Sequence, residues 1–207
     1  MKDRGLIVAV SGPSGVGKGT VLARVEELME HAAPGSVGHS ISVTTRAPRG
    51  QEKDGVEYYF RTTEQFEQMI AEGKIVEYDK YVDNYYGTPS EPLEKMIEKG
   101  QDVLFDITIE GSLALDRKFG DDAATIFILP PSMDVLEQRL RGRGTETEEK
   151  IQLRLAQAKN EIKRAGEFEY IITNDDLERA AGDILAIIKS EKLKASRNTN
   201  AFKKFES

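Results

Sequence analysis

The stretch SGPSGVGKGT, residues 11–20, decides the fold. Apolar residues 5–10 precede it and a helical pattern follows it, so the sequence predicts a strand that runs through a glycine-rich loop into a helix. A loop with few side chains can surround a phosphate with backbone N–H groups at the N-terminus of a helix. Lys18 adds a positive charge for the terminal phosphates of a nucleotide. The glycines that precede this lysine are Gly12, Gly15 and Gly17.

The loop matches the phosphate-binding pattern G-x-x-x-x-G-K-[ST] except at its last position. Gly12 to Lys18 fit the pattern, whereas Gly19 stands where a hydroxyl is usual and Thr20 follows one residue later. The alternative is a strand–turn–helix whose glycines only ease a tight turn. The spacing, the lysine and the preceding strand favour nucleotide binding.

The composition of the 207 residues excludes several classes of function. A net charge of -7, with 31% charged residues, disfavours general capture of nucleic acid, although it leaves room for a local basic pocket. The chain has no cysteine, which excludes disulfides, thiolate zinc sites and thiol catalysis. No apolar run reaches a membrane-spanning length and no secretory signal is visible, so we expect a cytoplasmic protein with no membrane or nucleic-acid partner.

Strands and helices alternate along most of the chain, which predicts an α/β fold with a doubly wound parallel sheet of the P-loop type. Ligands in such folds bind beyond the carboxyl ends of the strands, where the loop, Asp106 and the segment after Leu129 are expected. Core strands are predicted at residues 5–10, 102–107, 123–129 and 170–173. Helical patterns cover residues 21–29, 62–73, 88–100, 132–140, 151–166 and 175–188, and Thr62, Thr88, Ser132 and Asp175 are the expected caps.

Two segments interrupt this alternation. Extended stretches at residues 39–45, 56–60, 75–81 and 84–88 predict a small mixed sheet inserted into the core. The polar, glycine-punctuated residues 141–149 predict a mobile lid. The expected organisation is a core in three pieces (1–35, 90–130 and 161–193), an insertion (36–89), a lid with its flanking helices (131–160) and a disordered tail (194–207).

Five motifs, in this order, resemble those of guanylate kinases, which belong to the nucleoside monophosphate kinase group of P-loop proteins. They are SGPSGVGKGT (11–20), SVTTRAPRGQE (42–52), NYYGT (84–88), RGTETEE (143–149) and NDD (174–176). The resemblance runs from about residue 5 to about residue 188. It implies transfer of the terminal phosphoryl group of ATP to GMP with Mg²⁺, giving ADP and GDP, in purine nucleotide metabolism and GMP recycling.

The resemblance also implies where GMP binds. Guanine presents two donors on one edge beside an acceptor oxygen, so a carboxylate and a hydroxyl can select it. By similarity the carboxylate is Glu77 and the hydroxyls are those of Ser42 and Thr88. The similar positions for the acceptor phosphate are Arg46, Arg49, Tyr58 and Tyr86, with Glu52 orienting the arginines and Asp106 serving the acceptor nucleotide. Taken singly, a strand tyrosine is more often a packing residue, and only the constellation changes that.

For ATP, the resemblance implies the whole phosphate loop and several residues far from it. The loop positions are Gly12, Pro13, Ser14, Gly15, Val16, Gly17, Lys18, Gly19 and Thr20, and the distant ones are Arg139, Arg143 and Asn174. The catalytic set implied by the family is Lys18, Arg46, Arg139, Arg143 and Arg154. No direct metal ligand is assigned, and Thr20 or Asp106 would hold Mg²⁺ through water.

Two positions depart from the family pattern, and two other functions stay open. Thr108 and Glu110 stand at the usual acidic and glutamine positions, which we expect to affect GMP affinity or rate more than the reaction. One alternative is a non-catalytic guanylate-kinase-like module that binds phosphorylated peptides. The other is a related P-loop kinase with a different phosphorylated acceptor, such as a ribose bisphosphate. The sequence leaves open whether deoxy-GMP is accepted and whether the protein is a monomer or a homodimer.

Overall fold

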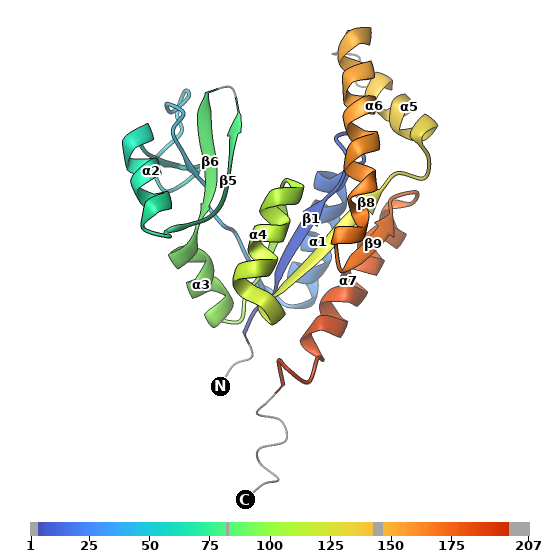
Figure 1. The fold of residues 1–207 in the computed structure, drawn as a ribbon. Helices are drawn as coiled ribbons and strands as arrows, with labels where there is room; N and C mark the ends of the chain where they lie inside the picture. Colours follow the sequence, from blue (N-terminus) through green and yellow to red (C-terminus); the bar gives the residue numbers. More distant parts are fainter. Residues whose placement is uncertain (1–3, 82, 143–146, 199–207) are drawn as a thin grey trace, which may run out of the picture.

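The computed structural model describes residues 4–81, 83–142 and 147–198, and Figure 1 shows its fold. The core is a five-stranded sheet with the order β2-β7-β1-β8-β9, in which every pair is parallel. The predicted doubly wound parallel sheet is therefore confirmed. Its strands are β1 (Ile7–Ser11), β2 (Val37–Gly38), β7 (Asp102–Asp106), β8 (Ala123–Leu129) and β9 (Tyr170–Thr173).

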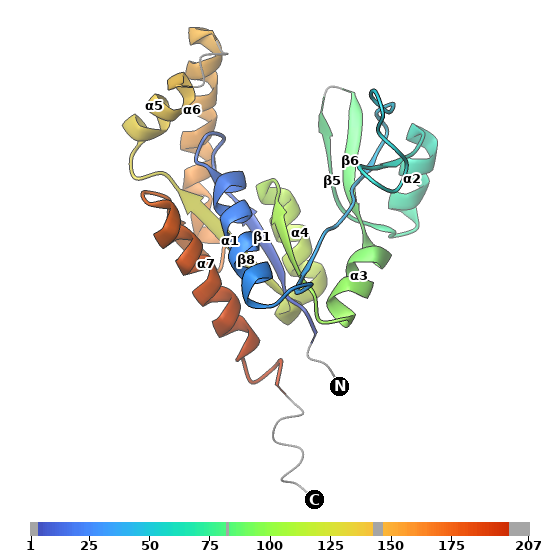
Figure 2. The same ribbon diagram turned by 180° about the vertical axis from the view of Figure 1, so that it is seen from behind.

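Helices cover both faces of this sheet, as the opposite views of Figure 1 and Figure 2 show. Strand β1 is buried along its whole length, so its successive side chains enter different cores. Val8 and Val10 pack with α1 (Lys18–Ala32) and α7 (Leu177–Lys192). On the other face, Ile7 and Ala9 pack with α3 (Ser90–Glu98) and α4 (Ile109–Phe119). The carboxyl end of β1, which carries the loop, is thus held from both sides.

A second, four-stranded sheet has the order β4-β3-β6-β5 and mixes parallel with antiparallel pairs, as predicted for the insertion. Helix α2 (Thr63–Ala71) buries Phe66 against it, and the Phe66 ring stacks on Tyr85 with centroids 5.1 Å apart. The predicted capping box of Thr62 and Gln65 begins this helix. The strands are β3 (Val43–Thr44), β4 (Tyr59–Phe60), β5 (Ile75–Tyr81) and β6 (Asn84–Pro89).

Helices α5 (Met133–Gly142) and α6 (Glu148–Lys163) form a pair that stands above the core on the side away from the small sheet (Figure 1). Leu136 and Leu140 pack against Ile151 and Leu155 between them. The predicted Ser132 cap is present, because its hydroxyl accepts from the Val135 amide at 3.2 Å. Residues 143–146 of the expected lid, Arg143 among them, lie outside the described residues.

The structure corrects several local predictions. Helix α4 was not predicted at all, and neither was strand β2. The strand expected over residues 56–60 is only β4, because the amides of Gly55 and Val56 form turn hydrogen bonds to Tyr58 and Lys53. Thr88 does not cap α3: it lies within β6, and Pro89 precedes the helix. The cap of α7 is Asp176 and not Asp175, since the Arg179 amide donates to the Asp176 carboxylate at 2.9 Å.

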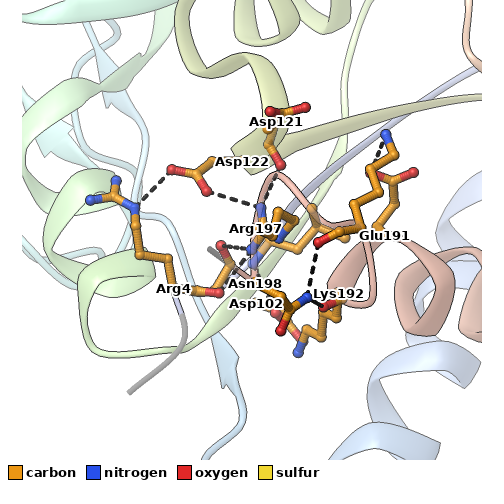
Figure 3. Close-up of polar contacts among 11 residues, drawn as sticks. Arg4, Asp102, Asp121, Asp122, Glu191, Lys192, Arg197 and Asn198 are labelled. Atoms are coloured by element: carbon orange, nitrogen blue, oxygen red, sulfur yellow. Dashed lines mark hydrogen bonds and ion pairs between the residues drawn. The ribbon is translucent and has the colours of Figure 1, made fainter. Parts of the chain in front are cut away.

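After α7 the chain turns back to the amino end of the main sheet, at the start of the segment expected to be a tail. Figure 3 shows Arg197 between Asp122 and the backbone near Arg4. Its guanidinium donates to the carbonyls of Arg4 and Gly5 at 2.8 and 3.0 Å and to the Asp122 carboxylate at 2.9 Å. These contacts fasten residues up to 198, and residues 199–207 lie outside the description.

Candidate active site

The phosphate loop joins β1 to α1, and its glycines are required by both conformation and space. Gly12 and Gly17 have φ values of 147° and 98°, in the region that favours glycine. A Cβ at Gly12 would lie 2.4 Å from the Ile128 carbonyl oxygen, and one at Gly17 would lie 2.6 Å from Nδ2 of Asn174. Gly17 is also the N-cap of α1, so no side chain of its own covers the first-turn amides. The loop therefore keeps a helix N-terminus bare for an anion.

Lys18 and Asp106 meet at the carboxyl edge of the sheet, because β1 and β7 are neighbours. The Lys18 ammonium donates to the Gly12 carbonyl at 2.8 Å and lies 3.6 Å from the Asp106 carboxylate. A cavity of about 740 Å³ opens beside them. Tyr78 and Asp79 of the small sheet also line this cavity. The cavity thus extends from the phosphate loop to the insertion.

Arg139 and Asn174, which are expected at the ATP site, and Arg154, which is expected in the catalytic set, contact the loop. Arg139 donates from Nη1 to the Val16 carbonyl at 3.0 Å and from Nη2 to the Asn174 carbonyl at 2.9 Å. The Asn174 amide donates to the same Val16 carbonyl at 2.7 Å. Arg154 donates to the Ser14 hydroxyl at 3.0 Å. Arg139 and Asn174 therefore hold loop backbone in this structure, which the sequence pattern did not predict.

In the insertion, Arg46 and Glu52 form a bidentate (two-pronged) ion pair, in which each of the two N–O distances is 3.0 Å. The Arg49 amide donates to the same carboxylate at 2.7 Å. These hydrogen bonds, first that of Arg46 and then that of Arg49, hold the pKa of Glu52 below its ordinary value. The Arg46 guanidinium lies over the Tyr58 ring, 5.3 Å from its centre, and the Tyr58 and Tyr86 rings meet edge to face at 6.1 Å. The structure thus gathers the expected acceptor-phosphate residues around Arg46.

Glu77 and Thr88 face each other across β5 and β6. The buried Thr88 hydroxyl donates to Oε1 of Glu77 at 2.5 Å. Burial raises the pKa of Glu77, and the Thr88 hydrogen bond partly opposes that rise. Ser42 lies one residue before β3, where its carbonyl accepts from the Tyr59 amide at 2.9 Å. A desolvated carboxylate beside a hydroxyl is the pair that the guanine hypothesis requires.

Sequence reasoning missed what the first turn of α4 does. Thr108 caps this helix by accepting from the Gly111 amide at 3.2 Å. Glu110 pairs with Arg164, the C-cap of α6, at 2.5 Å, and both line the large cavity. Gly111 lies against the carboxylate of Glu77. The available signal was Thr108 itself, because threonine is a common N-cap residue and it directly follows a predicted strand.

Residues 4–81, 83–142 and 147–198 contain no group of three or more histidine, aspartate or glutamate side chains placed to hold a metal ion. Within the same ranges, no helix has the length and apolar character needed to cross a membrane.

Comparison with known proteins agrees with this geometry. The guanylate kinase family model matches residues 4–191. A guanylate kinase of Oceanobacillus iheyensis is 42% identical over 204 residues, which are 99% of this chain and 96% of that protein. One of Streptococcus pneumoniae is 44% identical over 191 residues, covering 92% and 89%. The crystal structure of guanylate kinase from Anaplasma phagocytophilum has a TM-score of 0.69 and 33% identity, covering 95% and 90%. Because the family model matches nearly the whole length of this chain, the chain belongs to the guanylate kinase family.

Proposed function

We propose that the chain phosphorylates GMP with ATP by holding ATP on the phosphate loop and GMP against the small sheet. The reaction follows from the family: the chain is an enzyme, a nucleoside monophosphate kinase that forms ADP and GDP. The observation that carries the residue roles is the pairing of two different binding units around one cavity. The loop with Lys18 lies on one side of the cavity. Glu77, which pairs with Thr88, lies on β5, and the next two residues of that strand, Tyr78 and Asp79, line the other side.

At the donor side, the γ-phosphorus of ATP loses its bond to the ADP oxygen and gains one to a phosphate oxygen of GMP. Such a transfer needs positioning and neutralisation of charge more than acid–base chemistry. The bare first turn of α1 and the Lys18 ammonium would meet the transferred group. Arg139 and Asn174 would keep the loop in shape through the Val16 carbonyl, and Arg154 would approach the same phosphates from Ser14.

At the acceptor side, Glu77 would accept the two donors of the guanine edge, and the Ser42 hydroxyl would donate to its carbonyl oxygen. The Thr88 hydroxyl has a single hydrogen, which it donates to Oε1 of Glu77, so Thr88 would act by orienting that carboxylate. Adenine presents a ring-nitrogen acceptor where guanine has a donor, so the lone pair of that nitrogen would face the negatively charged carboxylate of Glu77 and no hydrogen bond could form. The GMP phosphate, a dianion, would bind Arg46 and Arg49 beside the Tyr58 and Tyr86 hydroxyls. Glu52 would act by orienting Arg46, because its two-pronged pair fixes the plane of the guanidinium.

Mg²⁺ that arrives with ATP fits this site as a water-mediated ion. Magnesium keeps several waters and is commonly held by one or two carboxylates together with phosphates. Asp106 is the carboxylate at the loop, and a Cβ at Gly19 would still be 3.8 Å from it, so the space beside it is open. Asp106 and Thr20 would hold the ion through water. Bound Mg²⁺ supplies neutralisation of phosphate charge.

The proposal is tested by measuring ADP formation from ATP with a panel of acceptors: GMP, deoxy-GMP, AMP, CMP, UMP and a ribose bisphosphate. We expect turnover with GMP to exceed that with every other acceptor that lacks guanine. Turnover highest with the ribose bisphosphate would instead support the related-kinase alternative. Binding of GMP without turnover would support the non-catalytic phosphopeptide module. The cytoplasmic location and the choice between monomer and homodimer stay predictions.

A further inference from the structure

We infer that Gly111, in the first turn of α4, is a specificity-determining positioning residue that leaves the Glu77 carboxylate room to read guanine. The inference rests on the proposed role of Glu77 in binding the base. It concerns a residue that contacts no phosphate and belongs to the main core, whereas Glu77 belongs to the small sheet.

The two oxygens of Glu77 have different surroundings. Oε1 accepts the Thr88 hydroxyl at 2.5 Å. Oε2 lies against α4, where a Cβ added at Gly111 would come within 2.9 Å of it. That distance is too short for a carbon and a carboxylate oxygen that are not bonded, so any side chain at 111 must displace the carboxylate. The glycine therefore leaves Oε2 the space it occupies beside α4.

The space around Gly111 explains why the displacement would fall on Glu77. The same Cβ would also meet Cδ1 of Ile107 at 3.2 Å and the Thr108 hydroxyl at 3.3 Å. The Thr108 hydroxyl is fixed by capping the Gly111 amide. The Glu77 carboxylate ends a side chain with several rotatable bonds, so it is the group that yields most easily. The cost should appear in base recognition more than in folding.

A shifted carboxylate should lose the two-donor contact with guanine selectively. Inosine monophosphate offers one donor on this edge because its base lacks the amino group of guanine, and a single hydrogen bond can realign. We therefore expect Gly111→Ala to raise the KM for GMP about tenfold, the effect of one hydrogen bond to a charged group. The KM for ATP should stay within about twofold, and the preference for GMP over inosine monophosphate, as a ratio of kcat/KM, should fall about tenfold.

Gly182→Ala is the matched control. Gly182 also lies inside a helix, α7, but a Cβ there would have nothing within 4 Å. Both substitutions replace a helical glycine by alanine, so they differ in the contacts that the new Cβ makes at position 111, of which the one with Glu77 is the shortest. Melting curves monitor folding. If Gly111→Ala melts early, the Ile107→Val/Gly111→Ala double variant removes the Cδ1 contact and keeps the contact with the carboxylate.

A double-mutant cycle with Glu77→Ala separates the two levels of the argument. We expect Glu77→Ala to lower the preference for GMP over inosine monophosphate and Gly111→Ala to add nothing in that background. If Glu77→Ala leaves the preference unchanged, the proposed role of Glu77 itself fails. If Glu77→Ala lowers it but Gly111→Ala does not, or if Gly111→Ala acts equally without the carboxylate, the inference about Gly111 is overturned.

Discussion

Replacing Glu77 with glutamine should relax the choice of base while leaving the fold intact. The glutamine oxygen can still accept the Thr88 hydroxyl, but the amide nitrogen then points a donor at one donor of guanine. Losing one hydrogen bond to a charged group and leaving a buried donor unpaired costs about 2–4 kcal/mol. This corresponds to a loss of roughly 30- to 1,000-fold in kcat/KM for GMP. For AMP the same amide can donate to the adenine ring nitrogen, so kcat/KM should hold or rise.

Comparing the pH dependence of kcat/KM between the wild type and Glu77→Gln gives an independent test of this contact. Guanine needs the charged carboxylate, so GMP binding is lost as pH falls through the pKa of Glu77 in the free enzyme. Burial raises that pKa, so the loss should begin at a higher pH than for an ordinary glutamate. The GMP phosphate titrates near pH 6 for both proteins. Dividing the wild-type profile of kcat/KM by that of Glu77→Gln removes this common effect and isolates Glu77.

Stability provides the control for this variant. A carboxyl group whose pKa is raised on folding destabilises the folded protein above that pKa, so removing its charge should not lower the melting temperature at pH 7.

The assay of base choice is steady-state ADP formation with GMP and with AMP at saturating ATP. An unchanged ratio of the two kcat/KM values would reject the assigned contact between Glu77 and the base.

The remaining predictions concern the loop and the amino end of the sheet. Lys18→Ala should melt like the wild type, because in the described part of the chain Lys18 contacts only the Gly12 carbonyl and Asp106. Its kcat should fall at least about 100-fold, and near-normal turnover would contradict the proposed donor side. Arg197→Ala should lower the free energy of unfolding, measured in urea titrations, by about 2–4 kcal/mol, because the nearly buried Arg197 guanidinium donates to three carbonyls and to Asp122 (Figure 3). The kcat of this variant should equal that of the wild type. Arg4→Ala, which removes a half-exposed partner of the same Asp122, should cost less than about 1 kcal/mol, and equal losses from the two variants would refute this account of the cluster.

Much of the fold was predictable because long apolar runs and alternation report burial directly. The bounds of β5, β8 and β9 agree with prediction for this reason. Helix α4 escaped because its buried residues are Gly111, Ser112 and Leu115, only one of which is apolar and large. Ser112 is buried with its hydroxyl hydrogen-bonded to that of Ser11, 101 residues away, and no local sequence pattern predicts such a contact.

The candidate site divides in the same way. Arg46 and Glu52 come from one short motif with fixed spacing, and the structure brings them together. Asp106 was expected near the loop because both follow core strands, and its carboxylate lies 3.6 Å from the Lys18 ammonium. The contacts of Arg139 and Asn174 with the Val16 carbonyl join residues more than 120 positions apart. The approach of Gly111 to Glu77 depends on how α4 packs against β5. These positions follow from tertiary packing, which residue spacing does not report.

The most direct test of the central claim is a competition between acceptors. Wild-type protein, limiting ATP and equal concentrations of labelled GMP and labelled AMP are incubated together, and the labelled diphosphates are separated. We expect labelled GDP to exceed labelled ADP by at least about 100-fold, since discrimination between the bases should be worth about 3 kcal/mol. Comparable yields of the two labelled diphosphates, or label left in both monophosphates while ATP is consumed, would contradict the account.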